Sequence, residues 1–320
     1  MTEDARTVSE LGEAGLIRLV ASFLPPAPTG ELWTGDDAAV VAVARDRAVL
    51  TTDTMVEGAD FDLSYCEGFD VGWKAVAVNV SDVAAMGGRP AHAVASLALP
   101  PSTEVSLVEG VARGLAAAAA EWELAVVGGD VSSAPVVVVG LTVLGDAAAP
   151  VRRSGARPGD LICLTGSIGG AWGGLELLRR GLGDRAPRLA ERHLRPRARV
   201  TEGQSLAASG ATAMIDVSDG LAIDLARVVN ASGAGCRVDP ASVPLDPDLH
   251  VLVDLGIVRA EDLLRGAILG GEDFELIATM RDADESTSVI GEVTDDEALR
   301  FGDDDLEELG RHGWDHLRGR

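Results

Sequence analysis

Acidic residues recur in glycine- and threonine-rich segments of this 320-residue chain, where each is expected to lie at the end of a strand. Four of these segments are predicted to follow apolar strands: 51–53, 128–130, 216–220 and 270–273. A fifth, 35–37, is predicted to precede one. Ligands of open α/β sheets bind beyond the carboxyl ends of strands, and glycine lets backbone amides approach them closely. Because Gly-Asp is also common turn chemistry, the recurrence indicates a site, whereas a single turn would not.

A further carboxylate lies in residues 70–88, which have the pattern of a buried helix. Asp70 is a suitable N-cap, and Gly87 and Gly88 form a clear stop. The segment is apolar nearly all round, with Asn79 and Asp82 on one face. A buried carboxylate needs a partner or loses its charge, so Asp82 is expected to meet either a metal ion or the amides of a neighbouring loop.

Clustered carboxylates of this kind indicate metal ions and phosphate. Two carboxylates about 4 Å apart repel each other by about 4 kcal/mol at an effective dielectric constant near 20. Oxygen ligands without a cysteine or histidine pair favour Mg²⁺, which prefers carboxylates shared with substrate phosphates. The chain has no GxxxxGK[ST] loop, HRD or DFG set, or GxGxxG fingerprint, so metals and backbone amides would have to hold a nucleotide. The glycine-rich stretch 165–174 is either such an amide cradle or a tight strand-to-helix turn.

The composition agrees with a two-domain α/β protein, since 47% of the residues are hydrophobic and 38 are glycine. A net charge of −24 argues against nucleic acid or an anionic membrane surface as a partner. The three cysteines have no ligand spacing, which fits a reducing cytosol. The sequence contains no signal peptide and no long apolar run, so we expect a cytoplasmic protein.

Strands alternating with helices are expected to position these residues, which predicts an α/β fold. The polar segment 146–159 is the expected boundary between a domain at 1–147 and a domain at 148–320. In the first domain we predict helices at 9–24, 70–88 and 104–122, and strands at 38–43, 48–50, 92–99, 124–127 and 136–144. In the second we predict strands at 160–164, 213–215 and 274–279, helices at 175–180, 201–209 and 221–230, short helical pieces at 251–256 and 261–264, a basic connector at 187–196, and an acidic tail from 281.

Taken in order, these motifs resemble those of the thiamine-monophosphate kinase family, within the superfamily of aminoimidazole-ribonucleotide synthetase. The resemblance covers nearly the whole chain and rests on SELGE (9–13), GDDAAV (35–40), TTDTMVEG (51–58), GWKAVAVNVSDVAAMGG (72–88), GGD (128–130), DVSDGL (216–221) and GGEDFEL (270–276). It implies an N-terminal α/β domain that closes a β-barrel across a homodimer, and a C-terminal α/β domain that completes the active site. The implied activity is ATP-dependent phosphorylation of thiamine monophosphate to thiamine diphosphate, by direct in-line transfer with several Mg²⁺ ions.

The resemblance also implies roles for particular residues. The implied magnesium ligands are Asp37, Thr51, Thr52, Asp53, Asp82, Asp130, Asp216 and Asp219. The implied ATP contacts are Gly129, Asp130, Arg153 and Ser218, and the implied substrate contacts are Asp60, Glu272 and Trp314. No residue is assigned as a catalytic acid, base or nucleophile, because the acceptor phosphate is already anionic at neutral pH.

One position departs from the family pattern and leaves the substrate end less well defined. The family usually reads VEGVHF, whereas this chain reads VEGADF at 56–61, with Asp60 in place of the histidine. An ionised carboxylate cannot donate to a phosphate. Asp60 is therefore expected either to bind a metal or to face the cationic thiazolium ring of the substrate.

Alternatives within the superfamily differ at identifiable positions. Selenophosphate synthetase needs a reactive cysteine in an N-terminal glycine-rich segment, whereas the first cysteine here is Cys66. A hydrogenase-maturation dehydratase ends in cysteine, whereas this chain ends in Arg320. Two alternatives remain, an aminoimidazole-ribonucleotide synthetase-like ligase and a non-catalytic paralogue that binds ATP and metal.

Overall fold

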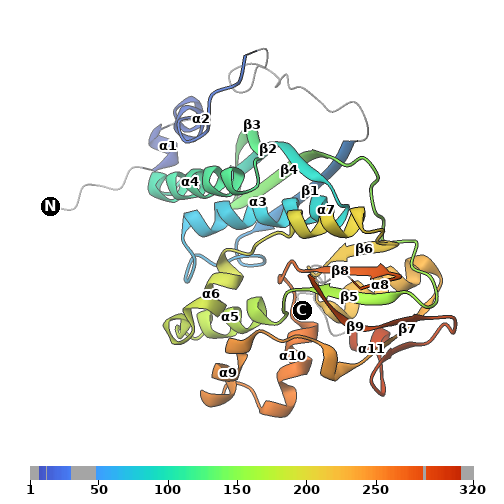
Figure 1. Ribbon diagram of the computed structural model, residues 1–320. Coiled ribbons are helices and arrows are strands. Elements are labelled where there is room, and N and C mark those ends of the chain that lie inside the picture. The colour runs from blue at the N-terminus through green and yellow to red at the C-terminus, as the bar shows by residue number, and fades with distance from the viewer. Residues whose placement is uncertain (1–6, 12, 30–47, 284–285, 311–320) are drawn as a thin grey trace. The chain divides into compact units, whose positions relative to one another are not determined.

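A computed structural model describes residues 7–11, 13–29, 48–283 and 286–310. The chain divides into two compact units, which we describe separately (Figure 1). The first consists of Met1–Val83 and Arg89–Ala148, and the second of Ala84–Gly88 and Ala149–Arg320. No helix among the described residues combines the length and the hydropathy that a membrane span requires.

The first unit is built on a four-stranded sheet in the order β1-β4-β2-β3. Its strands are β1 (Ala48–Val56), β2 (Arg89–Leu99), β3 (Ala125–Ser133) and β4 (Val138–Asp146), and its helices are α1 (Val8–Leu11), α2 (Glu13–Ala21), α3 (Gly68–Ala85) and α4 (Val105–Glu121). Strand β4 pairs antiparallel with β1 and β2, whereas β2 and β3 are parallel. Among the strands that the structure describes, β1 and β3 form the two edges, so these four strands do not close into a barrel.

The two faces of this sheet differ in burial. Side chains alternate between faces, and one set, including Leu97 and Leu141, is buried. The other face leaves Leu50 69% exposed and Val94 43% exposed. The open face therefore carries apolar side chains that the described part of the chain leaves exposed.

Helices α3 and α4 pack at unusually close range (Figure 1). A Cβ added at Gly72 would lie 2.1 Å from the carbonyl oxygen of Val111, and one at Gly114 would lie 2.1 Å from that of Phe69. Only glycine permits backbones to approach this closely. The contact fixes the position of α3 along α4. It therefore also fixes the position of the polar residues that α3 carries.

The second unit contains a seven-stranded sheet in the order β11-β10-β7-β9-β5-β8-β6, antiparallel except between β10 and β7. Its strands are β5 (Leu161–Thr165), β6 (Ala213–Asp216), β7 (Gly235–Val238), β8 (Leu276–Met280), β9 (Thr287–Thr294), β10 (Leu299–Phe301) and β11 (Asp304–Asp305). Its helices are α5 (Gly170–Leu178), α6 (Pro187–Leu194), α7 (Val200–Ala208), α8 (Leu221–Ser232), α9 (His250–Asp254), α10 (Leu263–Leu269) and α11 (Leu306–Gly310), with 3₁₀ turns η1 (Gly183–Arg185), η2 (Pro240–Ser242), η3 (Pro247–Leu249) and η4 (Ala260–Asp262).

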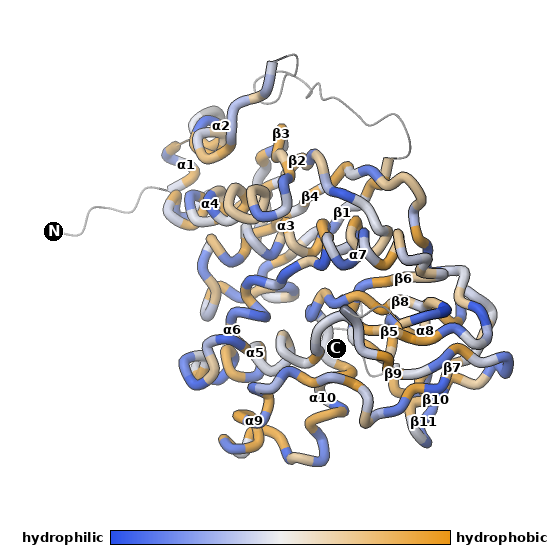
Figure 2. Tube along the Cα trace, viewed as in Figure 1, coloured by the Kyte–Doolittle hydropathy of each residue, from blue (hydrophilic) through white to orange (hydrophobic). Residues whose placement is uncertain are grey.

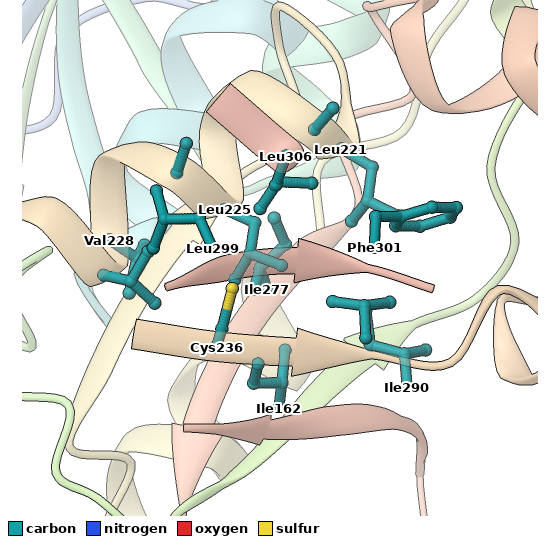
Figure 3. Packing of buried hydrophobic residues seen from close by; sticks show 14 of the residues in the cluster. Ile162, Leu221, Leu225, Val228, Cys236, Ile277, Ile290, Leu299, Phe301 and Leu306 are labelled. Carbon is teal, nitrogen blue, oxygen red and sulfur yellow. The ribbon is translucent and has the colours of Figure 1, made fainter. Parts of the chain in front are cut away.

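Strands β5 and β8 and the edge strand β6 of this sheet are buried on both faces. Strands β5, β6 and β8 are apolar along most of their length (Figure 2). Ile277 belongs to the core formed with α8 and α11, which Figure 3 shows in detail, whereas its neighbours Leu276 and Ala278 pack with Leu206 of α7. The period of two thus assigns alternate residues to two separate cores.

Several predicted elements differ from the observed ones. The motifs 51–53 and 128–130 lie inside β1 and β3 rather than in turns after strands, because full pairing with β4 and β2 outweighs the low strand preference of Asp and Gly. The motif 270–273 follows a helix and precedes β8. The predicted connector 187–196 contains α6, and the predicted acidic tail contains β9, β10, β11 and α11. The predicted strand 38–43 lies outside the described residues.

Candidate functional site

In the first unit, β1 and α3 bring three of the predicted metal ligands together. The Thr51 hydroxyl donates a hydrogen bond to Oδ2 of Asp82. The backbone N–H of Asp53 donates to Oδ1 of the fully buried Asn79, 2.9 Å away, and the Asn79 amide donates to the Ala75 carbonyl at 3.0 Å. Asn79 therefore fastens the middle of β1 to α3, beside the carboxylate of Asp82.

Thr52 contributes to a different face of the sheet. Its hydroxyl donates to the Leu141 carbonyl at 2.8 Å and accepts from the Thr142 hydroxyl at 3.0 Å. Since neighbouring strand residues alternate in direction, the Thr52 side chain lies on the open face, opposite Thr51 and Asp53. Any contribution of Thr52 to the Thr51–Asp82 position would therefore come from its backbone oxygen.

Asp130 lies near the far edge of the same sheet. The register places Gly129 of β3 in the row of Asp53, with Leu141 and Ala95 between them. Three interstrand spacings amount to about 14 Å. Aspartate side chains are too short to close this distance around an ion whose ligand oxygens lie about 2.1 Å away. Within one chain, Asp53 and Asp130 thus occupy two separate positions.

Gly129 also has a packing role. A Cβ at this position would lie 2.0 Å from the carbonyl oxygen of Ala95 in the neighbouring strand β2. Any other residue would push β3 away from β2. This contact explains the glycine without a ligand, so the GGD sequence by itself does not establish nucleotide binding.

The turn at 56–60 gives Asp60 a structural role. Oδ2 of Asp60 accepts a hydrogen bond from the backbone N–H of Val56 at 2.8 Å, and its own N–H donates to the Val56 carbonyl at 2.9 Å. The buried Lys74 donates from Nζ to the Asp60 carbonyl at 3.2 Å. Asp60 thus closes its own turn, a task that needs no ligand.

In the second unit, the motifs at 216–220 and 270–274 meet. Strands β6 and β8 are antiparallel, with Asp216 opposite Leu276, so the start of β8 lies beside the end of β6. The Glu272 N–H donates to the Ser218 carbonyl at 2.8 Å, and the Phe274 N–H donates to the Val217 carbonyl at 3.0 Å. The second motif therefore reaches the carboxyl end of β6 even though no strand leads into it.

Asp224, in the first turn of α8, organises the loop that carries the predicted ligands. Its Oδ2 accepts hydrogen bonds from the backbone N–H groups of Ser218, Asp219 and Gly220, at 3.0, 2.9 and 3.1 Å. Its Oδ1 accepts from Arg227 at 2.6 Å, and Arg227 also meets Asp219 at 2.6 Å. Burial raises the pKa of Asp224 to about 6, and the neighbouring Asp219 adds to this effect.

This arrangement determines the polarity of the loop. Three consecutive amides are occupied by Asp224, so they do not form a phosphate cradle. The other polar groups of the loop are oxygens, of which the carbonyls of Val217 and Ser218 accept the Phe274 and Glu272 N–H groups and the Asp219 carboxylate meets Arg227. An oxygen-rich loop suits a cation better than an anion, and the metal-ligand roles of Asp216 and Asp219 stay predictions.

In the glycine-rich stretch 165–174, three backbone N–H groups donate hydrogen bonds within the protein, as in a structural turn. The N–H groups of Gly169 and Ala171 donate to the buried Asp273 carboxylate at 2.6 and 3.0 Å. The Ile168 N–H donates to the Pro244 carbonyl at 3.0 Å. Burial raises the pKa of Asp273 to about 7. Of the two alternatives that the sequence left open, these contacts favour the tight turn.

A buried charge network supports the same loops. The Glu275 carboxylate accepts from Arg199 Nε at 2.8 Å and Arg199 Nη2 at 2.6 Å, and from the Thr165 hydroxyl at 2.7 Å. Arg192 meets Glu275 at 3.3 Å and donates to the Ser167 carbonyl at 2.7 Å. The network ties α6, α7, β5 and the start of β8 together.

The other predicted residues are placed as follows. The carbonyl of Arg153 accepts from Ser232, at the last turn of α8, whereas Ser218 lies before its first turn. Twelve helical residues separate these ends by about 18 Å, so Arg153 and Ser218 would contact distant parts of any shared ligand. Asp37 and Trp314 lie outside the described residues.

The donor set of the first unit fits Mg²⁺. Among the residues described, no three His, Cys, Asp or Glu side chains form a ready-made metal cluster. Mg²⁺ usually binds one or two carboxylates and takes its remaining oxygens from water and substrate phosphates. Asp53, Asp82 and the Thr51 hydroxyl match that requirement.

Sequence reasoning missed the residues that hold the site in shape. Asn79 was noticed for its spacing from Asp82 but was not assigned a role. Asp273 belongs to the segment 270–273, for which the sequence predicted a ligand site, but its carboxylate binds the amides of Gly169 and Ala171 instead. No role was predicted for Asp224, Glu275 or His193. A usable signal was present for Asp224, since a carboxylate three or four residues into a helix can accept from the N–H groups that precede it.

Comparisons with known proteins agree with this architecture. Models of the AIR synthase related protein family match residues 35–147 (N-terminal domain) and 157–304 (C-terminal domain). The thiamine-monophosphate kinase of Mycobacterium tuberculosis is 36% identical over 318 residues, which cover 98% of this chain and 94% of that protein. The crystal structure of thiamine-monophosphate kinase from Stenotrophomonas maltophilia K279a has a TM-score of 0.77 at 32% identity, covering 88% and 93% of the two chains. AaThiL complexed with AMPPCP and TMP has a TM-score of 0.75 at 33% identity, covering 93% and 96%.

Proposed function

Because this chain belongs to the thiamine-monophosphate kinase family of AIR synthase related proteins, we propose that it transfers the γ-phosphoryl group of ATP to thiamine monophosphate. The products are thiamine diphosphate and ADP. The grouping of Thr51, Asp53 and Asp82 carries the proposal, because it supplies hard oxygen ligands for a metal-bound nucleotide. The similar structure with AMPPCP and TMP supports the same pair of substrates.

The mechanism is direct in-line transfer. Bound Mg²⁺ would neutralise charge on the phosphates and orient them. Asp53 and Asp82 in the first unit and Asp216 and Asp219 in the second would hold such ions. The attacking phosphate oxygen of the acceptor is already anionic, so no side chain has to remove a proton from it. The protein acts by positioning the two phosphates.

The remaining contacts divide between the two units. Gly129 and Asp130 in the first unit, and Ser218 and Arg153 in the second, would contact ATP. The backbone oxygen of Thr52 and the carboxylate of Asp37 would add metal ligands. Glu272 and Trp314 would face the cationic thiazolium, which an acidic group and an aromatic ring both favour. Asp60, which closes its own turn, would line the substrate end.

We expect purified protein to form thiamine diphosphate and ADP in equal amounts from ATP, Mg²⁺ and thiamine monophosphate. Chelation of Mg²⁺ by EDTA should abolish both products, and added Mg²⁺ should restore them. Chromatographic assay of both products measures this. ATP binding without products would favour a non-catalytic paralogue, and ADP formation only with another acceptor would favour a ligase.

We further propose that the open face of the four-stranded sheet pairs with that of a second copy and closes a β-barrel across a homodimer. Leu50 and Val94 on this face are 69% and 43% exposed. Apolar side chains grouped on an open sheet face indicate an interface. The edge strands β1 and β3 also carry backbone groups that a partner could pair.

The Leu50→Lys, Val94→Lys double variant should therefore be monomeric, because two charges would be buried without partners. Light scattering coupled to gel filtration measures the mass. Val289→Lys is the matched control, since Val289 is 39% exposed but lies in β9 of the other unit. A dimeric double variant, or a monomeric wild type, would contradict the proposed interface.

A further inference from the structure

The loop that carries Glu272 is held in a strained conformation. Glu272 and Phe274 have φ values of 67° and 51°, in the left-handed region that non-glycine residues rarely adopt. Such a backbone is unfavourable for a residue with a Cβ and persists only where its surroundings fix it. A strained loop of this kind points to a functional constraint on the side chains that it presents.

Contacts on both sides fix this loop. The N–H groups of Glu272 and Phe274 donate to the carbonyls of Ser218 and Val217. On the other side, the carboxylate of Asp273 accepts the N–H groups of Gly169 and Ala171. The backbone on either side of Glu272 is therefore anchored. These contacts do not fix the direction of its long side chain.

His193 of α6 contacts the carboxylate at the end of that side chain. Its Nδ1 lies 3.2 Å from Oε2 of Glu272. The His193 side chain is 5% exposed, whereas that of Glu272 is 30% exposed, so a buried ring meets a carboxylate that solvent and ligands can still reach. The adjacent Arg192 binds the Ser167 carbonyl and Glu275, which anchors α6 and therefore the ring.

We propose that His193 is a positioning residue that holds the Glu272 carboxylate toward the cationic ring of the acceptor. This inference rests on the proposed function, in which Glu272 recognises a cation. A charged side chain held in place by a buried neighbour loses less conformational freedom on binding. His193 accordingly determines affinity for the cationic acceptor, whereas ATP binding does not depend on it.

Two conservative variants separate this role from packing. In asparagine the amide nitrogen is attached directly to Cγ, as Nδ1 is in histidine, whereas in glutamine it is one atom further out. His193→Asn should keep the KM for thiamine monophosphate within threefold of wild type. His193→Gln should raise it at least tenfold, with kcat and the KM for ATP changed less than threefold. His250→Gln is the control, because His250 is exposed and contacts only the Pro247 carbonyl among the hydrogen bonds resolved for it.

A double variant tests the pathway of the effect. If His193 acts through Glu272, His193→Gln should add no more than twofold to the KM of Glu272→Gln. Fully additive effects would overturn the proposal, as would equal KM values for His193→Asn and His193→Gln or a matching rise in the KM for ATP.

A spectroscopic measurement is independent of turnover and of whether the His193 variants fold. In protein labelled with ¹⁵N-histidine, Glu272→Gln should shift the side-chain nitrogen signals of one histidine of the five. Unchanged signals would overturn the contact. If wild type forms no thiamine diphosphate but the signals shift, the proposed function fails and the His193–Glu272 contact stands.

Discussion

Replacing Asp82 by asparagine is expected to lower turnover by about 10²–10³-fold, the loss typical when one preorganised electrostatic group is removed from a site. The asparagine keeps the shape of the side chain and still accepts the Thr51 hydroxyl, but it loses the charge that a metal requires. The free energy of unfolding should fall by less than about 1 kcal/mol, because the position is only half-buried. Steady-state kinetics at saturating Mg²⁺ and urea unfolding measure the two effects.

Asp303→Asn serves as the matched control, since it removes the same charge from an exposed position. It should leave both turnover and stability unchanged. Turnover of Asp82→Asn close to that of wild type at saturating Mg²⁺ would count against the magnesium site in the first unit. A large loss of stability would instead assign Asp82 a structural role.

Glu275→Gln should give the largest loss of stability, about 3 kcal/mol. The substitution leaves Arg199 and Arg192 without the carboxylate that both contact, and breaking a buried ion pair typically costs about 3–5 kcal/mol. We expect the lower end of this range, because the two arginine side chains remain 26–27% exposed. The midpoint and slope of urea unfolding give the change.

The control for this variant is Glu292→Gln, in the same sheet. Glu292 pairs with Arg237 at 3.2 Å, but the two side chains are 53% and 60% exposed. Exposed pairs contribute only about 0–1 kcal/mol, so this variant should unfold nearly as wild type does. Equal losses in the two variants would show that the burial of Glu275 has no special importance.

The sequence predicted the elements whose patterns are local. The apolar run and glycine stop of 70–88 predicted α3, and the apolar runs at 136–144 and 274–279 predicted the core strands β4 and β8. The short strands β7, β10 and β11 were missed, because two to four residues carry little periodic signal and pairing across the sheet decides their state.

The candidate site was predicted only in part, because only some of its residues can be recognised from the local sequence. Residue type and spacing singled out Thr51, Asp53 and Asp82, which the fold of the first unit brings together. The supports of the loops were not predictable in this way. Asp273 lies 104 and 102 residues from the amides that it accepts, and Glu275 lies 76 to 110 residues from Arg199, Arg192 and Thr165. At such separations the chain gives no local signal.

The contact between Lys74 and the Asp60 carbonyl has a practical consequence. Lys74 is the only lysine in the sequence, and it is 3% exposed. Reagents that acylate amines can therefore modify just one lysine side chain. They reach it only after the turn at 56–60 or the helix α3 has opened. The rate at which Lys74 is acylated therefore reports how often the first unit opens locally, without any introduced label.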